Sequence, residues 1–512
     1  MQVRRRVAPL LAVSVMATLA PALATAPATA ANNAAPAANT PSATAQRPDW
    51  QRCDDSEPAS LQCATIKVPL NHAKPGGKKI DIEISRIAAA DPAKRRGVLL
   101  FNPGGPGGEG LHFPSALGKA LPASVKDRYD LIGFDPRGIG RSNALACGLN
   151  PEEIQVERAF KEKTFARDAS RARSFADKCR ARYGDALKHF TTRNTARDMD
   201  MIRAALGEKK INYLGYSYGT YLGAVYTQLF PHRTDRVVLD SAVDPKRAWR
   251  EDFLLWAPEV EKAFTRWTRW TADRSAVYRL GDTPAKVAKT FWDIVAQANR
   301  KPITVGTATL DGDRIRSLMR APFFQAGYAA ESVVMLKKAA AGKPTPELPE
   351  SHWDDKGASA LWTVTCGDAP WPKNPGAYRK DAIRDRERYP LFGDFAANIT
   401  PCAFWDKNAE PATKVDNKVR ALIVQNEWDS QTPLPDALGL REDMKGSRLV
   451  LVDEGEGHGV YTTGTSRCAE SAVTSYLTAG TFPAKDLTCK PNPAKDRSGS
   501  TERPNPLPLP MR

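Results

Sequence analysis

The chain has 512 residues, which is too many for one simple hydrophobic core but suits one large domain with an insertion. Its formal net charge is +16, yet the lysines and arginines are dispersed among acids and form no basic stripe interleaved with aromatic residues. This distribution argues against a nucleic-acid-binding protein. It leaves only a loose, non-specific attraction to an anionic cell envelope.

The first thirty residues have the layout of a secretory signal peptide. Three arginines at residues 4–6 precede an apolar run over residues 7–19, and the small residues that follow offer A-x-A cleavage sites. The apolar run is shorter than the ~20 residues that cross a bilayer, so we expect export without stable membrane insertion. The arginines leave both the general and the twin-arginine export routes open. Residues 31–48 are predicted to be a flexible leader or pro-segment, and residues 491–512 a flexible tail.

Eight cysteines follow the signal segment, and an even number of cysteines in an exported chain implies disulfides. They are Cys53, Cys63, Cys147, Cys179, Cys366, Cys402, Cys468 and Cys489. Their spacing suggests four pairs of near neighbours in sequence order, although the sequence does not choose among the possible connectivities. No C-x-x-C or H-x-x-x-H spacing supports a zinc site. The sequence predicts neither a metal nor an organic cofactor.

Strand-like and helical segments alternate through the first half of the chain. Strands are expected at or near residues 65–68, 80–87, 97–101, 129–134, 210–214 and 236–240. A helix is expected over residues 194–206, with Thr195 as its cap and with Met199 and Ile202 on one face. This alternation predicts a mostly parallel sheet that is covered by helices on both faces.

The pattern changes after residue 245. From there to about residue 417 the chain is mainly helical in pattern and contains nine of the eleven tryptophans. Strand-like segments resume at residues 419–425 and 448–452. We therefore expect an α/β core in two parts, residues 49–245 and 418–490, with a large helical cap over residues 246–417 inserted after the sixth strand. Most of the tryptophans should pack the core of the cap, and a few could line a pocket.

A serine lies in a G-x-S-x-G frame at residues 215–219, between a predicted strand and a predicted helix. A turn sharp enough to lift a hydroxyl above a sheet edge leaves no room for side chains two residues to either side. The pentapeptide alone is weakly specific, but its strand–turn–helix context predicts Ser217 to be a nucleophile. The alternative is an ordinary serine in a turn.

A nucleophilic serine needs a base and an acid that orients the base. Of the six histidines, His458 alone lies in a glycine-flanked loop directly after the last predicted strand. In the order Ser–Asp–His, the acid follows the preceding strand. There we prefer Asp429, with Glu427 and the more distant Asp436 as alternatives.

Acyl transfer also needs hydrogen-bond donors for the developing oxyanion. The backbone N–H of Tyr218 is one expected donor. The glycine-rich loop over residues 102–110 should supply the other, with Gly105 preferred because Pro106 has no N–H. A phosphate-binding loop is disfavoured, since the run lacks a Lys-Ser/Thr ending and a G-x-G-x-x-G register.

Together, the segments at residues 102–110, 135–142, 194–219, 429–433 and 457–459 resemble the secreted bacterial tripeptidyl aminopeptidases. These enzymes form part of the prolyl-aminopeptidase-like branch of the α/β hydrolases, and the resemblance extends from about residue 50 to residue 489. It implies an α/β-hydrolase fold and an exported serine exopeptidase that releases short peptides, such as tripeptides, from free N-termini. By this resemblance, Ser217, Asp429 and His458 match the catalytic triad, and Gly105 and Tyr218 the oxyanion hole.

An aminopeptidase must also recognise the protonated amine of its substrate, and a partly buried carboxylate is the simplest means. Glu109, Asp240 and Asp368 are the candidates. Glu109 departs from the family pattern, since many relatives have a small residue there.

Two other functions remain open on sequence alone: a secreted carboxylesterase or lipase-like enzyme with the same triad, and a non-catalytic protein that binds the envelope. The leading prediction is a secreted peptidase, extracellular or associated with the envelope, that acts on peptide or protein N-termini. The sequence leaves its oligomeric state open.

Overall fold

The computed structural model describes residues 46–155, 157–348 and 354–493. The predicted signal peptide and most of the predicted leader and tail lie outside these residues. The strands are β1 (Gln51–Arg52), β2 (Gln62–Pro69), β3 (Lys79–Ile87), β4 (Gly97–Asn102), β5 (Tyr129–Phe134), β6 (Ile211–Tyr216), β7 (Thr234–Asp240), β8 (Ile303–Val305), β9 (Ala308–Leu310), β10 (Ala421–Trp428), β11 (Arg448–Glu456) and β12 (Leu487–Cys489).

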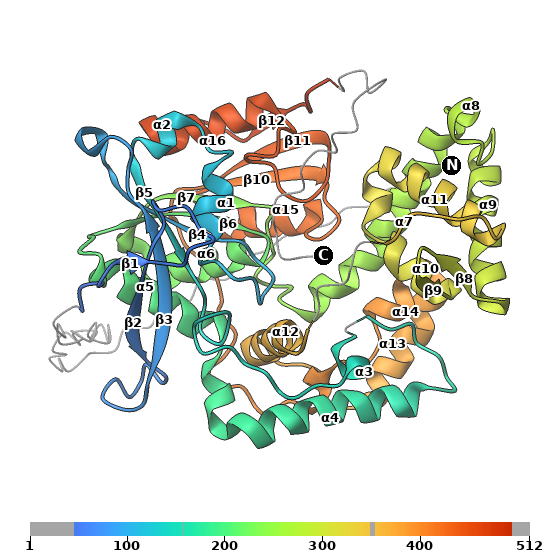
Figure 1. The fold of residues 1–512 in the computed structure, drawn as a ribbon, viewed down its shortest axis with the longest axis horizontal. Coiled ribbons are helices and arrows are strands. Elements are labelled where there is room, and N and C mark those ends of the chain that lie inside the picture. The colour runs from blue at the N-terminus through green and yellow to red at the C-terminus, as the bar shows by residue number, and fades with distance from the viewer. Residues whose placement is uncertain (1–45, 156, 349–353, 494–512) are drawn as a thin grey trace, which may run out of the picture. The chain divides into compact units, whose positions relative to one another are not determined.

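The α-helices cover the sheet and make up most of the segment between β7 and β10 (Figure 1). They are α1 (Phe113–Gly118), α2 (Ala123–Lys126), α3 (Pro151–Ile154), α4 (Phe165–Tyr183), α5 (Thr192–Ala205), α6 (Tyr218–Leu229), α7 (Arg250–Ala272), α8 (Ser275–Tyr278), α9 (Pro284–Arg300), α10 (Gly312–Met319), α11 (Ala326–Ala340), α12 (Asp355–Asp368), α13 (Pro375–Arg388), α14 (Gly393–Ala396), α15 (Leu434–Asp443) and α16 (Arg467–Ala479). Short 3₁₀ helices are η1 (Pro92–Lys94), η2 (Gly184–His189), η3 (Pro231–Arg233), η4 (Pro322–Phe324) and η5 (Pro401–Phe404).

Ten strands form one sheet in the order β1-β2-β3-β5-β4-β6-β7-β10-β11-β12. The pairs β1–β2, β2–β3 and β3–β5 are antiparallel, and every pair from β5 to β12 is parallel. The carboxyl ends of β4, β6, β7, β10 and β11 therefore meet along one edge of the sheet. In sheets of this kind, loops at that edge carry the functional groups.

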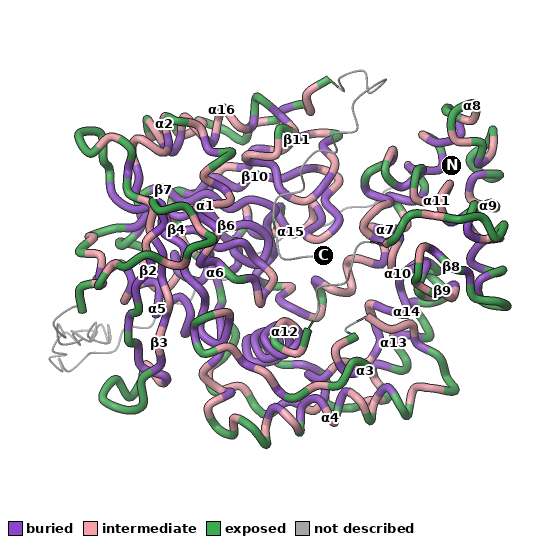
Figure 2. The backbone as a smooth tube through the Cα atoms, in the orientation of Figure 1, coloured by how far each residue is buried: buried purple, intermediate pink, exposed green. Residues whose placement is uncertain are grey.

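Both faces of the sheet are buried, which is why its central strands are almost purely apolar. All six residues of β4 are buried. Val98 and Leu100 pack with α5 and α6 on one face, whereas Leu99 and Phe101 pack with α1, α2 and α16 on the other. Figure 2 shows the burial of these strands, and of most of α12, in purple.

The helices between β7 and β10 build a hydrophobic cluster of their own. It joins α7, α9, α10 and α11 to the small ribbon β8–β9, with Trp267 fully buried at its centre. Figure 1 shows these helices grouped together in green and yellow. We refer to residues 246–417 as the insertion. Within it, Trp256, Trp270 and Trp292 are only partly buried and pack at the margin of the cluster.

The expected strands of the first half form as β2 to β7, and the fold class is confirmed. Two details differ. The insertion follows the seventh strand, because the two-residue strand β1 pairs with β2 ahead of the expected strands. Helix α5 begins at Thr192 and not at residue 194, because the Thr191 side chain caps it by accepting from the Asn194 N–H. The prediction of Thr195 as the cap was therefore wrong.

The eight cysteines form four disulfides between near neighbours in sequence order, as their spacing suggests. The pairs are Cys53–Cys63, Cys147–Cys179, Cys366–Cys402 and Cys468–Cys489. In the part of the chain that the structure describes, no helix is long and apolar enough to cross a membrane.

Candidate active site

Ser217 lies in the sharp turn between β6 and α6. Its backbone is held at φ 56° and ψ −126°, a region that residues with a side chain rarely adopt, and only 4% of its surface is exposed. The flanking glycines are a steric requirement. A Cβ on Gly215 would lie 2.4 Å from the Gly219 carbonyl oxygen, and one on Gly219 would lie 2.7 Å from the carbonyl oxygen of Asn102 at the end of β4. The turn is thus packed against two strands.

Asp429 and His458 are in direct contact. The His458 Nδ1 lies 2.8 Å and 2.9 Å from the two carboxylate oxygens of Asp429, which follows β10 and is fully buried. Asp429 Oδ1 also accepts the N–H groups of Gln431 at 2.8 Å and Thr432 at 3.1 Å. The carboxylate thus fixes the imidazole ring through Nδ1. Within the described residues, the buried Nε2 of His458 has no hydrogen-bond partner.

The Ser217 turn and the His458 loop are joined through the end of β7. The Ser217 N–H donates to the backbone carbonyl of Asp240 at 3.0 Å. The Asp240 carboxylate accepts the N–H of Val460 at 3.0 Å, and the Ser241 hydroxyl accepts the N–H of Gly459 at 2.8 Å. The Ser217 hydroxyl and His458 Nε2 make no hydrogen bond, a common arrangement in sites without substrate.

The glycine loop packs against this turn at Gly104, next to Tyr218. Tyr218 is the first residue of α6, and its N–H has no partner within the helix. In the glycine loop, a Cβ on Gly104 would lie 2.8 Å from the Cβ of Ser217 and 3.4 Å from the Tyr218 nitrogen. The Gly104 N–H is occupied by the Asn102 side chain at 3.1 Å. The next N–H along this loop is that of Gly105.

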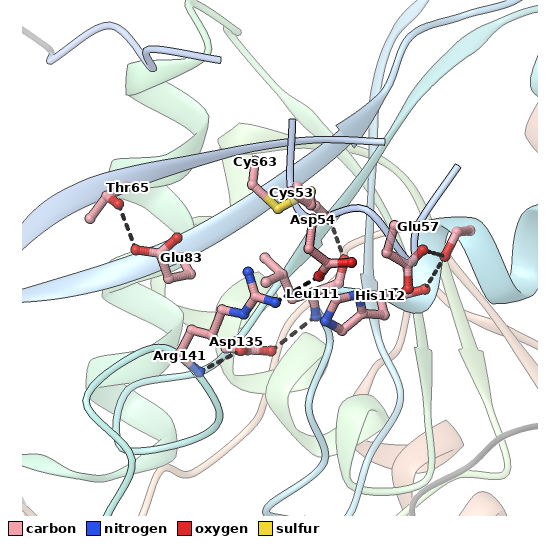
Figure 3. The surroundings of a disulfide bond; sticks show 12 residues. Cys53, Asp54, Glu57, Cys63, Thr65, Glu83, Leu111, His112, Asp135 and Arg141 are labelled. Atoms are coloured by element: carbon pink, nitrogen blue, oxygen red, sulfur yellow. Dashed lines mark hydrogen bonds and ion pairs between the residues drawn. A yellow bond between two sulfur atoms is a disulfide. The ribbon is translucent and has the colours of Figure 1, made fainter. Parts of the chain in front are cut away.

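A buried carboxylate supports the far end of the glycine loop (Figure 3). Asp135, at the carboxyl end of β5, accepts the N–H of Gly110 at 2.9 Å and that of Arg141 at 2.8 Å. The Arg141 guanidinium also contacts Asp54 at 2.9 Å, one residue from the Cys53–Cys63 disulfide. Burial raises the pKa of Asp135, while these N–H groups oppose the rise. The disulfide-bonded segment thus helps to fix the loop.

The three candidate amine-binding carboxylates lie in different surroundings. Asp240 is fully buried, and burial raises its pKa to about 7 although backbone N–H groups stabilise its charge. Asp368 is also buried and accepts from the Thr192 N–H and hydroxyl and from Trp249 Nε1. These bonds favour structural roles for both residues. Glu109 is exposed, next to the Asp135 side chain.

Neither alternative acid, Glu427 or Asp436, makes a hydrogen bond to His458. Glu427 accepts the N–H of Glu454 at 2.7 Å, so its carboxylate is bound to β11. Asp436 lies in the first turn of α15 beside Asp252 of α7, and both are buried. Neither oxygen of Asp436 accepts a hydrogen bond from another described residue, and the Arg247 Nε lies 3.5 Å from one of them. Two such carboxyls can bond to each other only if one holds a proton.

This pair makes stability depend on pH. Burial raises the pKa of Asp252 to about 7, and burial together with the neighbouring charge raises that of Asp436 further. The folded state therefore holds more protons than the unfolded chain from about pH 4, the ordinary carboxyl pKa, to pH 7 and above. Its stability falls as the pH rises through that window.

Asp436→Asn should remove most of this dependence, because the amide donates to Asp252 without a titrating proton. We compare the free energy of unfolding of the variant with that of the wild type at each pH. The difference, variant minus wild type, should be larger at pH 8 than at pH 5 by on the order of 2 kcal/mol. Urea unfolding at both pH values measures the change, with the exposed Asp293→Asn as the control. If the free energies of unfolding of the wild type and of Asp436→Asn change equally with pH, the result contradicts a proton shared between Asp252 and Asp436.

The chain is similar in sequence to known proteins over most of its length. A family model described as "alpha/beta hydrolase fold" matches residues 97–286, and one described as "TAP-like protein" matches residues 389–489. A tripeptidyl aminopeptidase of Streptomyces lividans is 37% identical over 473 residues, with 87% of each chain covered.

Two mycobacterial relatives are also similar over most of their length. The serine protease Hip1 of Mycobacterium tuberculosis is 29% identical over 479 residues, covering 86% of this chain and 90% of the relative. A carboxylesterase B of the same species is 31% identical over 500 residues, covering 89% and 92%.

The mostly parallel sheet, the strand–turn–helix at Ser217 and the family match define an α/β hydrolase, and the protein is a serine hydrolase. Its similarity to peptidases along nearly its whole length supports a serine peptidase. The chain belongs to the tripeptidyl aminopeptidase family.

Proposed function

We propose that this protein is a secreted serine exopeptidase that cleaves near a free N-terminus and releases tripeptides through an acyl-enzyme. The observation that carries the proposal is the hydrogen bonding of His458. Its Nδ1 bonds to Asp429, its Nε2 is left without a partner among the described residues, and its loop is tied to the Ser217 turn through Asp240.

In the proposed reaction, the Ser217 hydroxyl oxygen attacks the scissile carbonyl carbon while His458 Nε2 takes its proton. The negative charge that develops on the carbonyl oxygen is stabilised by the N–H groups of Tyr218 and Gly105. His458 then gives the proton to the leaving amine as the C–N bond breaks. A water molecule, deprotonated by the same nitrogen, hydrolyses the ester and restores Ser217. Asp429 stabilises the imidazolium throughout.

Export is supported by the four disulfides, since such bonds persist in oxidising compartments. The predicted signal peptide lies outside the described residues. We propose an extracellular or envelope-associated location, where free peptide N-termini are the substrates.

A comparison of substrates tests the proposed reaction. A tripeptide p-nitroanilide with a free N-terminus should be cleaved, and its N-acetylated form should be cleaved much more slowly, because acetylation removes the positive charge. Equal rates for the two forms would contradict an aminopeptidase.

A secreted carboxylesterase is the second candidate, favoured by the similarity to carboxylesterase B. The same triad serves both reactions, so the site alone does not separate them. Short-chain p-nitrophenyl esters belong in the same assay. Turnover of esters without turnover of either anilide would favour the esterase.

A further inference from the structure

The loop that carries Asp429 is held by side chains from the insertion. Arg320, directly after α10, donates from Nη1 to the Ser430 carbonyl at 2.8 Å and from Nη2 to Oε1 of Gln431 at 2.9 Å. Trp256 of α7 donates its Nε1–H to the Gln431 carbonyl at 2.7 Å. Three hydrogen bonds from the insertion thus fix the two residues that follow Asp429.

These contacts continue to the imidazole. The Gln431 N–H donates to Asp429 Oδ1 at 2.8 Å, and the same oxygen lies 2.8 Å from His458 Nδ1. A continuous hydrogen-bonded path therefore runs from Arg320, through the backbone of the acid loop, to the predicted base. A shift of the Gln431 backbone would change both the position and the solvation of the carboxylate.

Arg320 is held in one arrangement. Its side chain is 8% exposed, and its guanidinium lies 4.1 Å from the ring centre of Trp256 and 5.2 Å from that of Phe392. Three carboxylates interact electrostatically with the guanidinium: Glu157, whose Oε1 lies 3.8 Å from Nε, Asp252 and Asp429. A planar cation that makes two directed bonds and stacks on aromatic rings is poorly replaced by lysine.

We propose that Arg320 is a positioning residue for the reaction: it holds Ser430 and Gln431 so that Asp429 meets His458, and it places a positive charge beside that pair. The insertion then takes part in assembling the acid–base pair. This inference rests on the proposed function, because it assumes that Asp429 and His458 act on Ser217.

Helix α10, which ends just before Arg320, offers a matched control. Arg316 of α10 is as buried as Arg320, with 7% of its side chain exposed, and it lies 4.9 Å from the ring centre of Phe395. Its polar partners are Asp313, Asp394 and the carbonyl of Pro390, all in the insertion. Arg316→Gln should therefore weaken the packing of the insertion without changing the acid loop.

The test compares Arg320→Gln, Arg320→Lys and Arg316→Gln on the free tripeptide anilide across pH, with rates corrected for the folded fraction. We expect Arg320→Gln to lower kcat by about 10- to 100-fold, with KM within about twofold of the wild type. The acidic limb of kcat/KM should move to higher pH, because loss of a nearby cation favours the protonated imidazole. Arg320→Lys should lower kcat but keep the acidic limb in place. Arg316→Gln should lower Tm alone.

Trp256→Phe is a milder variant that keeps the ring and removes the donor to Gln431. Its kcat should fall about three- to tenfold. The inference is overturned if Arg320→Gln retains the kcat and the acidic limb of Arg316→Gln, or if Trp256→Phe keeps full kcat.

Asp429→Asn, measured in the same assay, distinguishes a failure of the positioning role of Arg320 from a failure of the assigned triad. If it is inactive while Arg320→Gln is active, the positioning role fails and the proposed function stands. If Asp429→Asn is fully active, the assignment of Asp429 as the orienting acid fails and the positioning role fails with it, while cleavage of the free tripeptide anilide by the wild type tests the proposed function independently.

Discussion

Ser217→Ala should abolish hydrolysis while leaving the fold intact. Loss of a serine nucleophile costs about 10⁶-fold in kcat in a well-studied serine protease, so we expect a decrease of at least about 10⁴-fold here. The fold should survive because the hydroxyl of Ser217 makes no hydrogen bond to another described residue, whereas its backbone N–H and carbonyl bond to Asp240 and Thr220. Release of p-nitroaniline from the tripeptide anilide measures the loss.

The control for this variant is Thr220→Val, in the first turn of α6. The Thr220 hydroxyl donates to the Ser217 carbonyl at 2.6 Å and accepts the Val243 N–H at 2.9 Å, so its loss should lower stability far more than activity. If Ser217→Ala kept more than about a tenth of the wild-type rate, well above the residual of a lost nucleophile, the assignment would be wrong.

Asp429→Asn should lower kcat by about 10⁴-fold, the loss that the same change causes in a serine-protease triad. The asparagine oxygen can still accept the N–H groups of Gln431 and Thr432, so the loop should keep its shape. Its amide group then faces His458 Nδ1 and forces that nitrogen to accept. Nε2 must carry the proton and can no longer act as the base. Initial rates of hydrolysis of the tripeptide anilide, measured across pH, give the loss of kcat.

Glu427→Gln is the matched control, since Glu427 was the alternative acid and lies two residues away. Its carboxylate binds the Glu454 N–H, and a glutamine oxygen can accept the same bond. We expect near-wild-type kcat. A large loss in Glu427→Gln together with an active Asp429→Asn would reverse the assignment of the acid.

Much of the fold could be predicted because local patterns and tertiary structure agree. The apolar runs of β4, β5 and β6 are buried on both faces, and no other environment suits them. The short strands were missed for a physical reason. Strands of two or three residues, such as β1 and β12, have no periodicity and form only because a neighbouring strand offers free backbone groups.

Three residues of the candidate site could be predicted from the order Ser–Asp–His along the chain. Ser217, Asp429 and His458 follow β6, β10 and β11, which run parallel in one sheet, so their loops lie at the same sheet edge. The contacts of Arg320 and Trp256 were not predictable. They join residues more than one hundred positions apart, and an arginine or a tryptophan in a helical segment gives no signal of the loop that it will meet.

The role of the candidate amine-binding carboxylates was also not predictable from the sequence. Asp240, a candidate for the substrate amine, binds the backbone of the His458 loop. A carboxylate at a strand end can serve a ligand or a neighbouring loop, and only the folded chain distinguishes the two.

The central claim is that Ser217 is the residue that becomes acylated. The most direct measurement is covalent labelling of the intact protein with a fluorophosphonate, followed by peptide mapping by mass spectrometry. The account predicts one adduct per chain, on Ser217, with activity lost in proportion to labelling. An adduct on a different residue, or full activity after Ser217 is labelled, would contradict it.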